Sequence, residues 1–343
     1  MTATTSRTET SDEVVVEPMF SDRSLPLLIV PAAGADVGRW AEANRHWIKS
    51  ALEKHGALVF RQTGIETPEA FETFVRRISP DVADFKEESS PRHQVSGNVY
   101  TATDYPANYP VQFHTEFSYS HEWPMRLFFG CLHPSDQGGE TPVADTRRVY
   151  ERMSARTRQH YIEKRLMYVR NYNGEAMGVS WQKAFGTTDR SIVEEHFRNH
   201  RVEFEWGAGD SLRTRQYGDA VYIHPSTGEP VWFNHGFVFN PLAIEPEELR
   251  SAIVDSYSEE EYSTNTYFGD GEKIPQEFVE EEREAYRAVS VGFRWQKGDV
   301  LLVENMLAAH ARAPFKGSRR IVVAMAERQS RSHVKPVLNA TAP

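Results

Sequence analysis

His114 and Glu116 are the residues whose types and spacing point most directly to chemistry. They lie in residues 111–119, Val-Gln-Phe-His-Thr-Glu-Phe-Ser-Tyr, where apolar and polar residues alternate as in a β-strand. Side chains two positions apart on a strand point to the same face, so this imidazole and carboxylate can reach one common point. They would supply two ligands of the 2-His-1-carboxylate triad that binds non-haem Fe(II) and leaves positions open for other ligands.

The pair alone is weak evidence, because 13 histidines and 49 acidic residues in 343 positions give about two such pairs by chance. A second histidine from a distant strand is needed, and His310 is the candidate. It follows an apolar run at 300–303 and a stretch of small residues. The histidines in polar helical, terminal or turn contexts have ordinary structural explanations: His46, His55, His160, His196, His200, His224 and His333.

Arg319 and Arg320 follow His310 by nine and ten residues and precede an apolar strand at 321–326. An Fe(II) enzyme that uses an α-keto acid must neutralise the distal carboxylate of that acid, and a buried guanidinium with its bidentate geometry suits this task. If the strand includes both arginines, alternation turns only one of them inward, and Arg320 is our prediction. The alternative is a solvated pair after a turn.

Composition limits the class of protein. Hydrophobic residues make up 39% of the chain and aromatic residues 12%, enough for a sizeable core. The net charge of −10 argues against nucleic acid or an anionic membrane as a partner. Cys131 is the single cysteine, which excludes an intrachain disulfide and a cysteine-based zinc site. With no long apolar run and no signal peptide, we expect a cytoplasmic location.

The order of elements predicts a mainly β fold with inserted helices. We expect residues 1–25 to form a disordered tail, rich in Thr, Ser and acidic residues, and 26–335 to form a single domain. Strands are predicted at 27–30, 57–60, 95–101, 111–119, 125–132, 166–172, 202–206, 220–223, 231–239, 290–293, 300–303 and 321–326. Helices are predicted at 37–55, 68–78, 145–153, 185–200, 245–258 and 275–288.

Three motifs together resemble the TauD/TfdA superfamily of Fe(II)- and 2-oxoglutarate-dependent dioxygenases. They are His-Thr-Glu at 114–116, Gly-Gly-Glu-Thr-Pro at 138–142, and Glu-Asn-x4-His-x9-Arg at 304–320. Further stretches, among them Val-Ser-Gly-Asn-Val-Tyr-Thr at 95–101 and Gly-Glu-Pro-Val-Trp-Phe-Asn at 228–234, resemble the branch that contains the aspartate hydroxylase of syringomycin biosynthesis. The similarity extends from about residue 26 to residue 330.

The resemblance implies a double-stranded β-helix, the cupin-like jelly roll, with His114, Glu116 and His310 as the ligands of Fe(II). It implies that Thr141 and Arg320 hold 2-oxoglutarate, which reacts with O2 to give succinate and CO2 while an unactivated C–H bond is oxidised. Glu116 stands where most members have Asp, and because a carboxylate is present, halogenation is disfavoured. Taurine dioxygenases have a second Arg four residues after the co-substrate Arg; Ala324 at that position argues against a sulfonate substrate.

The resemblance also implies an amino acid or amino-acid-derived substrate, free or on a carrier protein, in a natural-product pathway such as antibiotic biosynthesis. Hydroxylation is the expected outcome, with desaturation or epoxidation as alternatives. A catabolic dioxygenase and a non-enzymatic cupin-like binding module are the other classes of function considered. Candidate substrate contacts are Arg92, Asn98, Tyr100, Arg213, Arg215, Asn234 and His235, although Arg92 has acidic neighbours as possible partners and Asn234 is equally compatible with a structural hydrogen bond.

Overall fold

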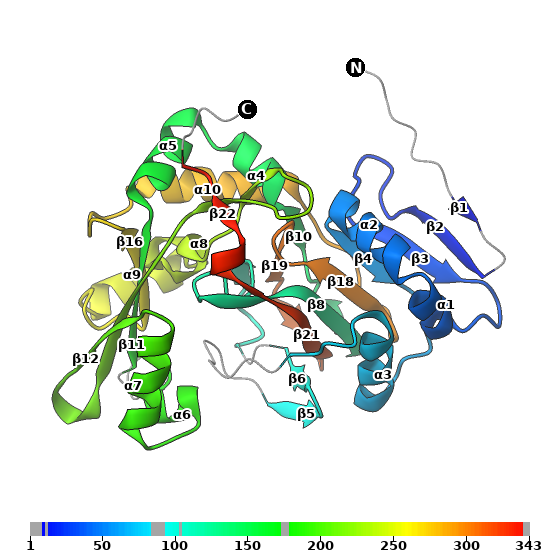
Figure 1. Ribbon diagram of the computed structural model, residues 1–343, viewed down its shortest axis with the longest axis horizontal. Coiled ribbons are helices and arrows are strands. Elements are labelled where there is room, and N and C mark those ends of the chain that lie inside the picture. The colour runs from blue at the N-terminus through cyan, green and yellow to red at the C-terminus, as the bar shows by residue number, and fades with distance from the viewer. Residues whose placement is uncertain (1–8, 11–12, 84–92, 103–104, 173–177, 339–343) are drawn as a thin grey trace.

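The computed structural model describes residues 9–10, 13–83, 93–102, 105–172 and 178–338. Its centre is a nine-stranded sheet in the order β1-β2-β3-β4-β18-β8-β21-β6-β5 (Figure 1). These strands are β1 (Glu9–Thr10), β2 (Val14–Pro18), β3 (Leu27–Pro31), β4 (Ala57–Phe60), β18 (Val300–Glu304), β8 (Glu122–His133), β21 (Arg320–Ser330), β6 (Val99–Thr101) and β5 (Gln94–Ser96). Of the pairs in this sheet, β3 and β4 run parallel.

A four-stranded sheet in the order β17-β10-β19-β7 faces the large sheet. Its strands are β17 (Ser290–Val291), β10 (Val143–Asp145), β19 (Ala308–Arg312) and β7 (Val111–His114). One hydrophobic core joins the two sheets, with Val143 and Ala309 from the small sheet packed with Leu127, Leu301 and Val323 from the large one. The ring of His310 in the small sheet lies 5.0 Å from that of Phe129 in the large sheet, so the candidate site lies between the two sheets.

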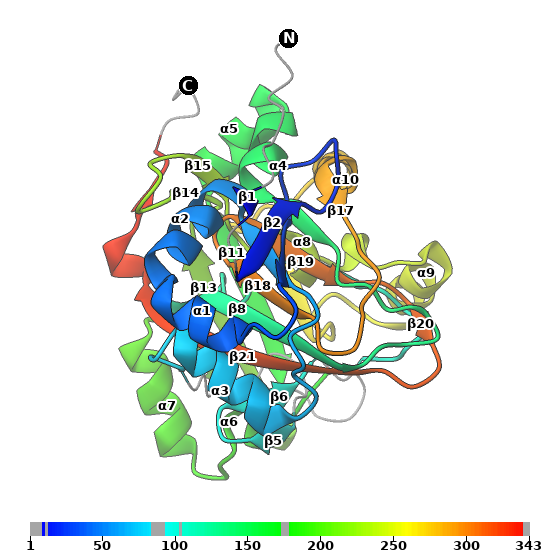
Figure 2. The same cartoon turned by 90° about the vertical axis from the view of Figure 1, so that its right-hand side faces the viewer.

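The outer face of the large sheet is covered by helices α1 (Val37–Ala43), α2 (Arg45–His55) and α3 (Pro68–Ile78), as Figure 2 shows. The single helix predicted at 37–55 is interrupted at Asn44, whose side chain donates a hydrogen bond to the Trp40 carbonyl. Helix α3 begins as predicted, because the Thr67 hydroxyl accepts a hydrogen bond from the Ala70 amide at 3.2 Å. Apolar residues of these helices form a second core against the sheet.

The predicted disordered tail is wrong for residues 14–18. They form β2, which pairs antiparallel with β3 and extends the sheet beyond β4. Val14 and Val16 are buried in the core beneath the helices. The Val-Val-Val run at 14–16 is the sequence signal for this strand, and the polar composition on its N-terminal side obscured it.

The remaining strands form three smaller sheets. The first contains β12 (Glu203–Trp206), β13 (Leu212–Gly218), β11 (Leu166–Tyr172) and β16 (Thr264–Phe268). The second contains β15 (Pro230–Trp232), β14 (Val221–Ile223) and β22 (Lys335–Pro336), and the third pairs β20 (Phe315–Lys316) with β9 (Gln137–Gly138). The other α-helices are α4 (Thr146–Arg152), α5 (Ala155–Lys164), α6 (Trp181–Phe185), α7 (Arg190–Asn199), α8 (Gly236–Phe239), α9 (Glu247–Ser256) and α10 (Gln276–Val289), with three 3-10 turns at Ala208–Asp210, Pro241–Ala243 and Arg331–His333. The strand predicted at 231–239 is wrong in its second half, which forms α8. Among the described helices, none has the length and apolar character that crossing a membrane requires.

Candidate metal and co-substrate site

The two histidines come from neighbouring strands of the small sheet. His114 is the last residue of β7 and His310 the third residue of β19, and the two lie directly opposite each other in the antiparallel register. Their ring centroids are 4.2 Å apart. Backbone pairing alone therefore brings together residues that are almost 200 positions apart in the sequence.

Glu116 reaches the histidines from a turn. The strand ends at His114, and residues 115–120 turn away from it, with Phe117 at a positive φ of 56°. The prediction that a strand extends through residue 119 is wrong, so same-face alternation is not what brings Glu116 to the histidines. Its Oε2 nevertheless lies 3.8 Å from Nε2 of His114 and 3.8 Å from Nε2 of His310.

The three side chains fit a single transition-metal ion. Two atoms bound to one ion through bonds of about 2.1 Å lie at most about 4.2 Å apart, and both carboxylate-to-imidazole distances satisfy this limit. His114 Nδ1 lies 2.8 Å from the Gln112 carbonyl oxygen. Because a carbonyl only accepts, Nδ1 carries the proton and the Nε2 lone pair faces Glu116. Of the described residues, these are the ones that form a possible metal site.

Two further residues surround the triad. Asn305 is completely buried and hydrogen-bonds both the amide and the carbonyl of Glu116 and the carbonyl of Pro124 in β8. His235 is also buried, and its ring packs edge-on against His114 at 5.7 Å. Burial and, to a smaller extent, the nearby His114 lower the pKa of His235 to about 3, so His235 is neutral near pH 7. The sequence interpretation missed the part played by Asn305.

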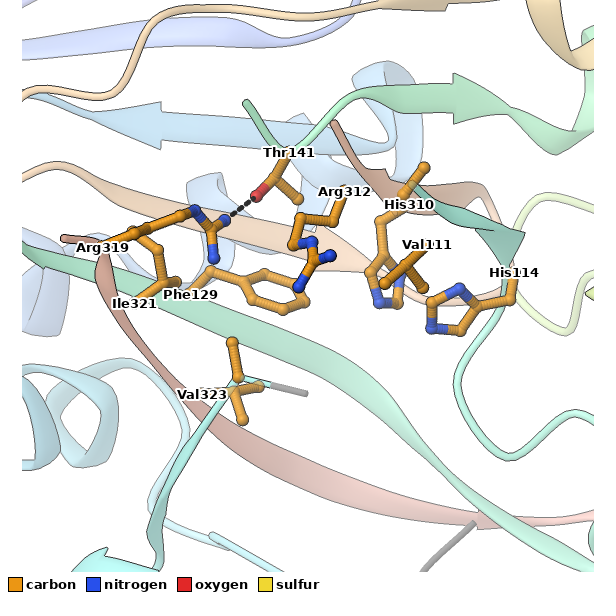
Figure 3. Close-up of a pocket in the computed structure, with 11 residues that line it drawn as sticks. Val111, His114, Phe129, Thr141, His310, Arg312, Arg319, Ile321 and Val323 are labelled. Carbon is orange, nitrogen blue, oxygen red and sulfur yellow. Dashed lines mark hydrogen bonds between the residues drawn. The ribbon is translucent and has the colours of Figure 1, made fainter. Parts of the chain in front are cut away.

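A pocket extends from the two histidines toward β21 (Figure 3). His114 and His310 line one end, and Arg319 and Thr141 line the other. Phe129 of β8 and Val323 of β21 form an apolar wall between them. This shape matches a short dicarboxylate with one end at the metal and the other at a guanidinium.

The prediction that Arg320 points inward is wrong. Arg319 lines the pocket, whereas Arg320 is exposed. Alternation does hold along β21, with Ile321 and Val323 on the pocket side and Val322 in the core beneath the helices. Both faces of this strand are buried, so the apolar pattern could not fix which set of residues points inward.

Thr141 lies at the arginine end of the pocket. Its hydroxyl accepts hydrogen bonds from Arg319 Nη2 at 3.4 Å and from Trp295 Nε1 at 3.2 Å. With both lone pairs engaged, the hydroxyl proton is left to be donated to an acceptor in the pocket. Arg319 Nε also donates to the Gly139 carbonyl at 2.9 Å, which fixes the plane of the guanidinium. Burial and, to a smaller extent, the charge of Arg312 lower the pKa of Arg319 to about 10, and Arg319 remains a cation near pH 7.

Residues 21–325 match the family described as "Taurine catabolism dioxygenase TauD, TfdA family". This chain belongs to the TauD/TfdA family. Dapdiamide synthesis protein DdaC of Enterobacter agglomerans is 31% identical over 297 residues, which cover 87% of this chain and 90% of that protein. A clavaminate synthase-like protein of Arabidopsis thaliana is 27% identical, covering 91% and 92% of the two chains.

Solved structures share the fold. PvcB of Pseudomonas aeruginosa superposes with a TM-score of 0.56 at 16% identity, covering 96% of both chains. A second PvcB structure, described as an Fe, alpha-ketoglutarate dependent oxygenase from an isonitrile synthetic pathway, also gives a TM-score of 0.56, covering 95% of this chain and 98% of its own. The predicted jelly roll is thereby confirmed. Membership of the TauD/TfdA family, together with the His-Glu-His group, makes the chain a dioxygenase with Fe(II), 2-oxoglutarate and O2 as cofactor and co-substrates.

The predicted substrate contacts of this TauD/TfdA dioxygenase are not brought together. Tyr100 of β6 lies opposite Val323, a residue of the pocket wall. Asn98 instead accepts a hydrogen bond from Arg76 at the surface, and the buried Asn234 uses its side chain on the Ala220 carbonyl and the Gly236 amide. Arg92 lies outside the described residues.

Arg213 and Arg215 lie on the less buried face of β13. Thr214 and Gln216, which alternate with them, are the buried residues of this strand. Arg215 lies 3.9 Å from Glu205 of β12, an exposed residue. That Arg215 contacts the substrate stays a prediction.

Proposed function

We propose that this dioxygenase hydroxylates an unactivated C–H bond of an amino acid or an amino-acid-derived substrate, free or attached to a carrier protein, in natural-product biosynthesis. The observation that carries the proposal is the buried His114–Glu116–His310 group at the mouth of a pocket that ends in Arg319. The 31% identity to a dapdiamide synthesis protein supports the biosynthetic role. Desaturation and epoxidation would require the same residues and are the alternatives to hydroxylation.

In this proposal His114, Glu116 and His310 hold Fe(II), which with bound 2-oxoglutarate supplies the oxidising power for the C–H bond. Arg319 pairs with the distal carboxylate of 2-oxoglutarate, and Thr141 donates its hydroxyl proton to the same group. The Phe129 side of the pocket excludes water along the chain of the co-substrate. A charged pair in such a desolvated pocket gives both affinity and a fixed orientation.

The position of Arg319 bears on the catabolic alternative. With Arg319 as the co-substrate arginine, the residue four positions later is Val323, which is apolar and lines the pocket. A sulfonate would find no guanidinium there, as was expected from Ala324. This argues for an uncharged or otherwise anchored reacting group rather than a sulfonate.

Anaerobic titration tests the proposal. Addition of Fe(II) and then 2-oxoglutarate should produce a visible charge-transfer band, and a true substrate should shift it. The candidates are free amino acids and the same amino acids on a carrier protein, with succinate and hydroxylated product measured after O2 is admitted. No band would show that the metal site is wrongly assigned; a band that shifts only with a sulfonate would overturn the amino acid proposal.

A further inference from the structure

Arg312 is a second buried guanidinium in the same pocket, and its contacts are unusual. It lies two residues after His310 on β19 and is 8% exposed. Its Nη1 donates to the Tyr105 carbonyl at 2.7 Å, and its Nη2 donates to the carbonyls of Pro106 at 2.6 Å and Tyr109 at 2.7 Å. One side chain of the metal-binding strand therefore holds the segment 105–109, which leads directly into β7.

None of these partners is anionic. Within the part of the chain that the structure describes, no carboxylate forms an ion pair with Arg312 or with Arg319. In Figure 3 the Arg312 side chain lies between Arg319 and His310. Both guanidiniums also contact the ring of Phe315, at 5.3 Å and 5.5 Å from its centroid. The pocket thus contains two positive charges that repel each other, the buried Arg312 and the partly buried Arg319.

An anion in the pocket would relieve this repulsion. A carboxylate near both would favour the two charged side chains in their present positions. It would thereby hold the Arg312 guanidinium in the position from which it donates to the three carbonyls.

We propose that Arg312 is a positioning residue that couples occupancy of the co-substrate pocket to the order of segment 105–109. The coupling is reciprocal: the anion tightens the segment, and the segment holds Arg312 where it favours the anion. A second link supports this arrangement, because the Phe315 amide donates to the Ala107 carbonyl at 2.8 Å. The inference rests on the proposed binding of 2-oxoglutarate in this pocket.

Hydrogen exchange of the unchanged protein is the first test. With Mn(II) bound, the amides of Tyr105, Ala107, Asn108 and Tyr109 should exchange more slowly when 2-oxoglutarate is added. Arg312→Gln should abolish this ligand-dependent protection and weaken 2-oxoglutarate by roughly tenfold, within the 5–150-fold range of such couplings. Arg312→Lys should recover part of the affinity through its charge but little of the protection, because an ammonium cannot reach three carbonyls in a fixed plane.

The matched control is Arg39→Gln, which removes one positive charge from an exposed position on α1. It should leave both affinity and protection as in the unchanged protein. If the unchanged protein binds 2-oxoglutarate but the protection of these amides does not change, the proposed role of Arg312 is overturned and the proposed function is not. If the unchanged protein does not bind 2-oxoglutarate at all, both this inference and the proposed function fail.

Discussion

Asn305 holds the peptide groups of Glu116 from both sides: its Oδ1 accepts from the Glu116 amide at 2.7 Å, and its Nδ2 donates to the Glu116 carbonyl at 2.8 Å. The same Nδ2 donates to the Pro124 carbonyl at 2.8 Å. The residue after Glu116 has a positive φ, so this turn needs external support. Asn305 supplies that support from the end of β18 and thereby fixes the carboxylate opposite the histidines.

Replacing Asn305 by Ala should weaken metal binding by roughly 10–100-fold, as is typical when a residue that orients a ligand is lost. It should also lower the free energy of unfolding by about 1–3 kcal/mol, since buried backbone groups lose their partner. Metal titration and urea denaturation measure the two effects. The metal affinity of Asn305→Asp should lie between those of the unchanged protein and Asn305→Ala. An unchanged metal affinity in Asn305→Ala would refute the supporting role of Asn305.

Replacing Arg319 and Arg320 one at a time shows which of them binds the co-substrate. Arg319→Gln should raise the 2-oxoglutarate concentration needed for half-saturation by roughly 10–100-fold, because a buried charged hydrogen bond is lost. Arg320→Gln should behave like the unchanged protein, since that side chain is exposed. The charge-transfer band titrated with 2-oxoglutarate measures both. The opposite ranking would restore Arg320 as the co-substrate residue.

His310→Ala should abolish 2-oxoglutarate turnover while the protein stays folded. The strand β19 keeps its pairing with β7 and β10 through backbone hydrogen bonds, which do not depend on the imidazole. Succinate production measures the first effect and circular dichroism the second. Normal succinate production would remove His310 from the metal site.

Glu282 on α10 should make stability depend on pH. Burial raises its pKa to about 7, although hydrogen bonds from Trp232 Nε1 at 2.7 Å and the Tyr161 hydroxyl at 3.4 Å lower it in part. The folded state therefore holds a proton that the unfolded state releases near pH 4.5, and stability falls as the pH rises from about 4.5 to 7. The loss attributable to this group is on the order of 3 kcal/mol.

Glu282→Gln should flatten this part of the stability curve, because the amide keeps an acceptor for Trp232 without a titrating proton. Urea denaturation at a series of pH values between 4.5 and 8 provides the measurement. An identical slope in both proteins would show that other groups cause the pH dependence.

Much of the site was predictable because its motifs are local in sequence. Thr67 and Pro68 predict the start of α3, and the motifs predict His114, Glu116 and His310 as metal ligands. The strand that carries His310 was not predicted, since Ala308–Arg312 contains three alanines and lacks the β-branched residues typical of strands. Its place in the fold depends on pairing with β7 and β10, which are distant in sequence.

Other features depend on tertiary contacts that no local pattern encodes. The turn that carries Glu116 requires Asn305, almost 190 positions away, and the hold of Arg312 on segment 105–109 spans about 200 positions. The inward orientation of Arg319 depends on which face of β21 meets the small sheet. Long-range polar contacts of this kind must be seen in three dimensions.

The two faces of strand β21 have different functions. Ile321 and Val323 face the reaction pocket, whereas Val322, Ala324 and Ala326 pack beneath the helices. A substitution of Ile321 or Val323 changes the wall of the co-substrate pocket, whereas a substitution of Val322 or Ala324 changes the packing of the outer helices. Variants of the two sets therefore separate what co-substrate binding requires of this strand from what folding requires of it.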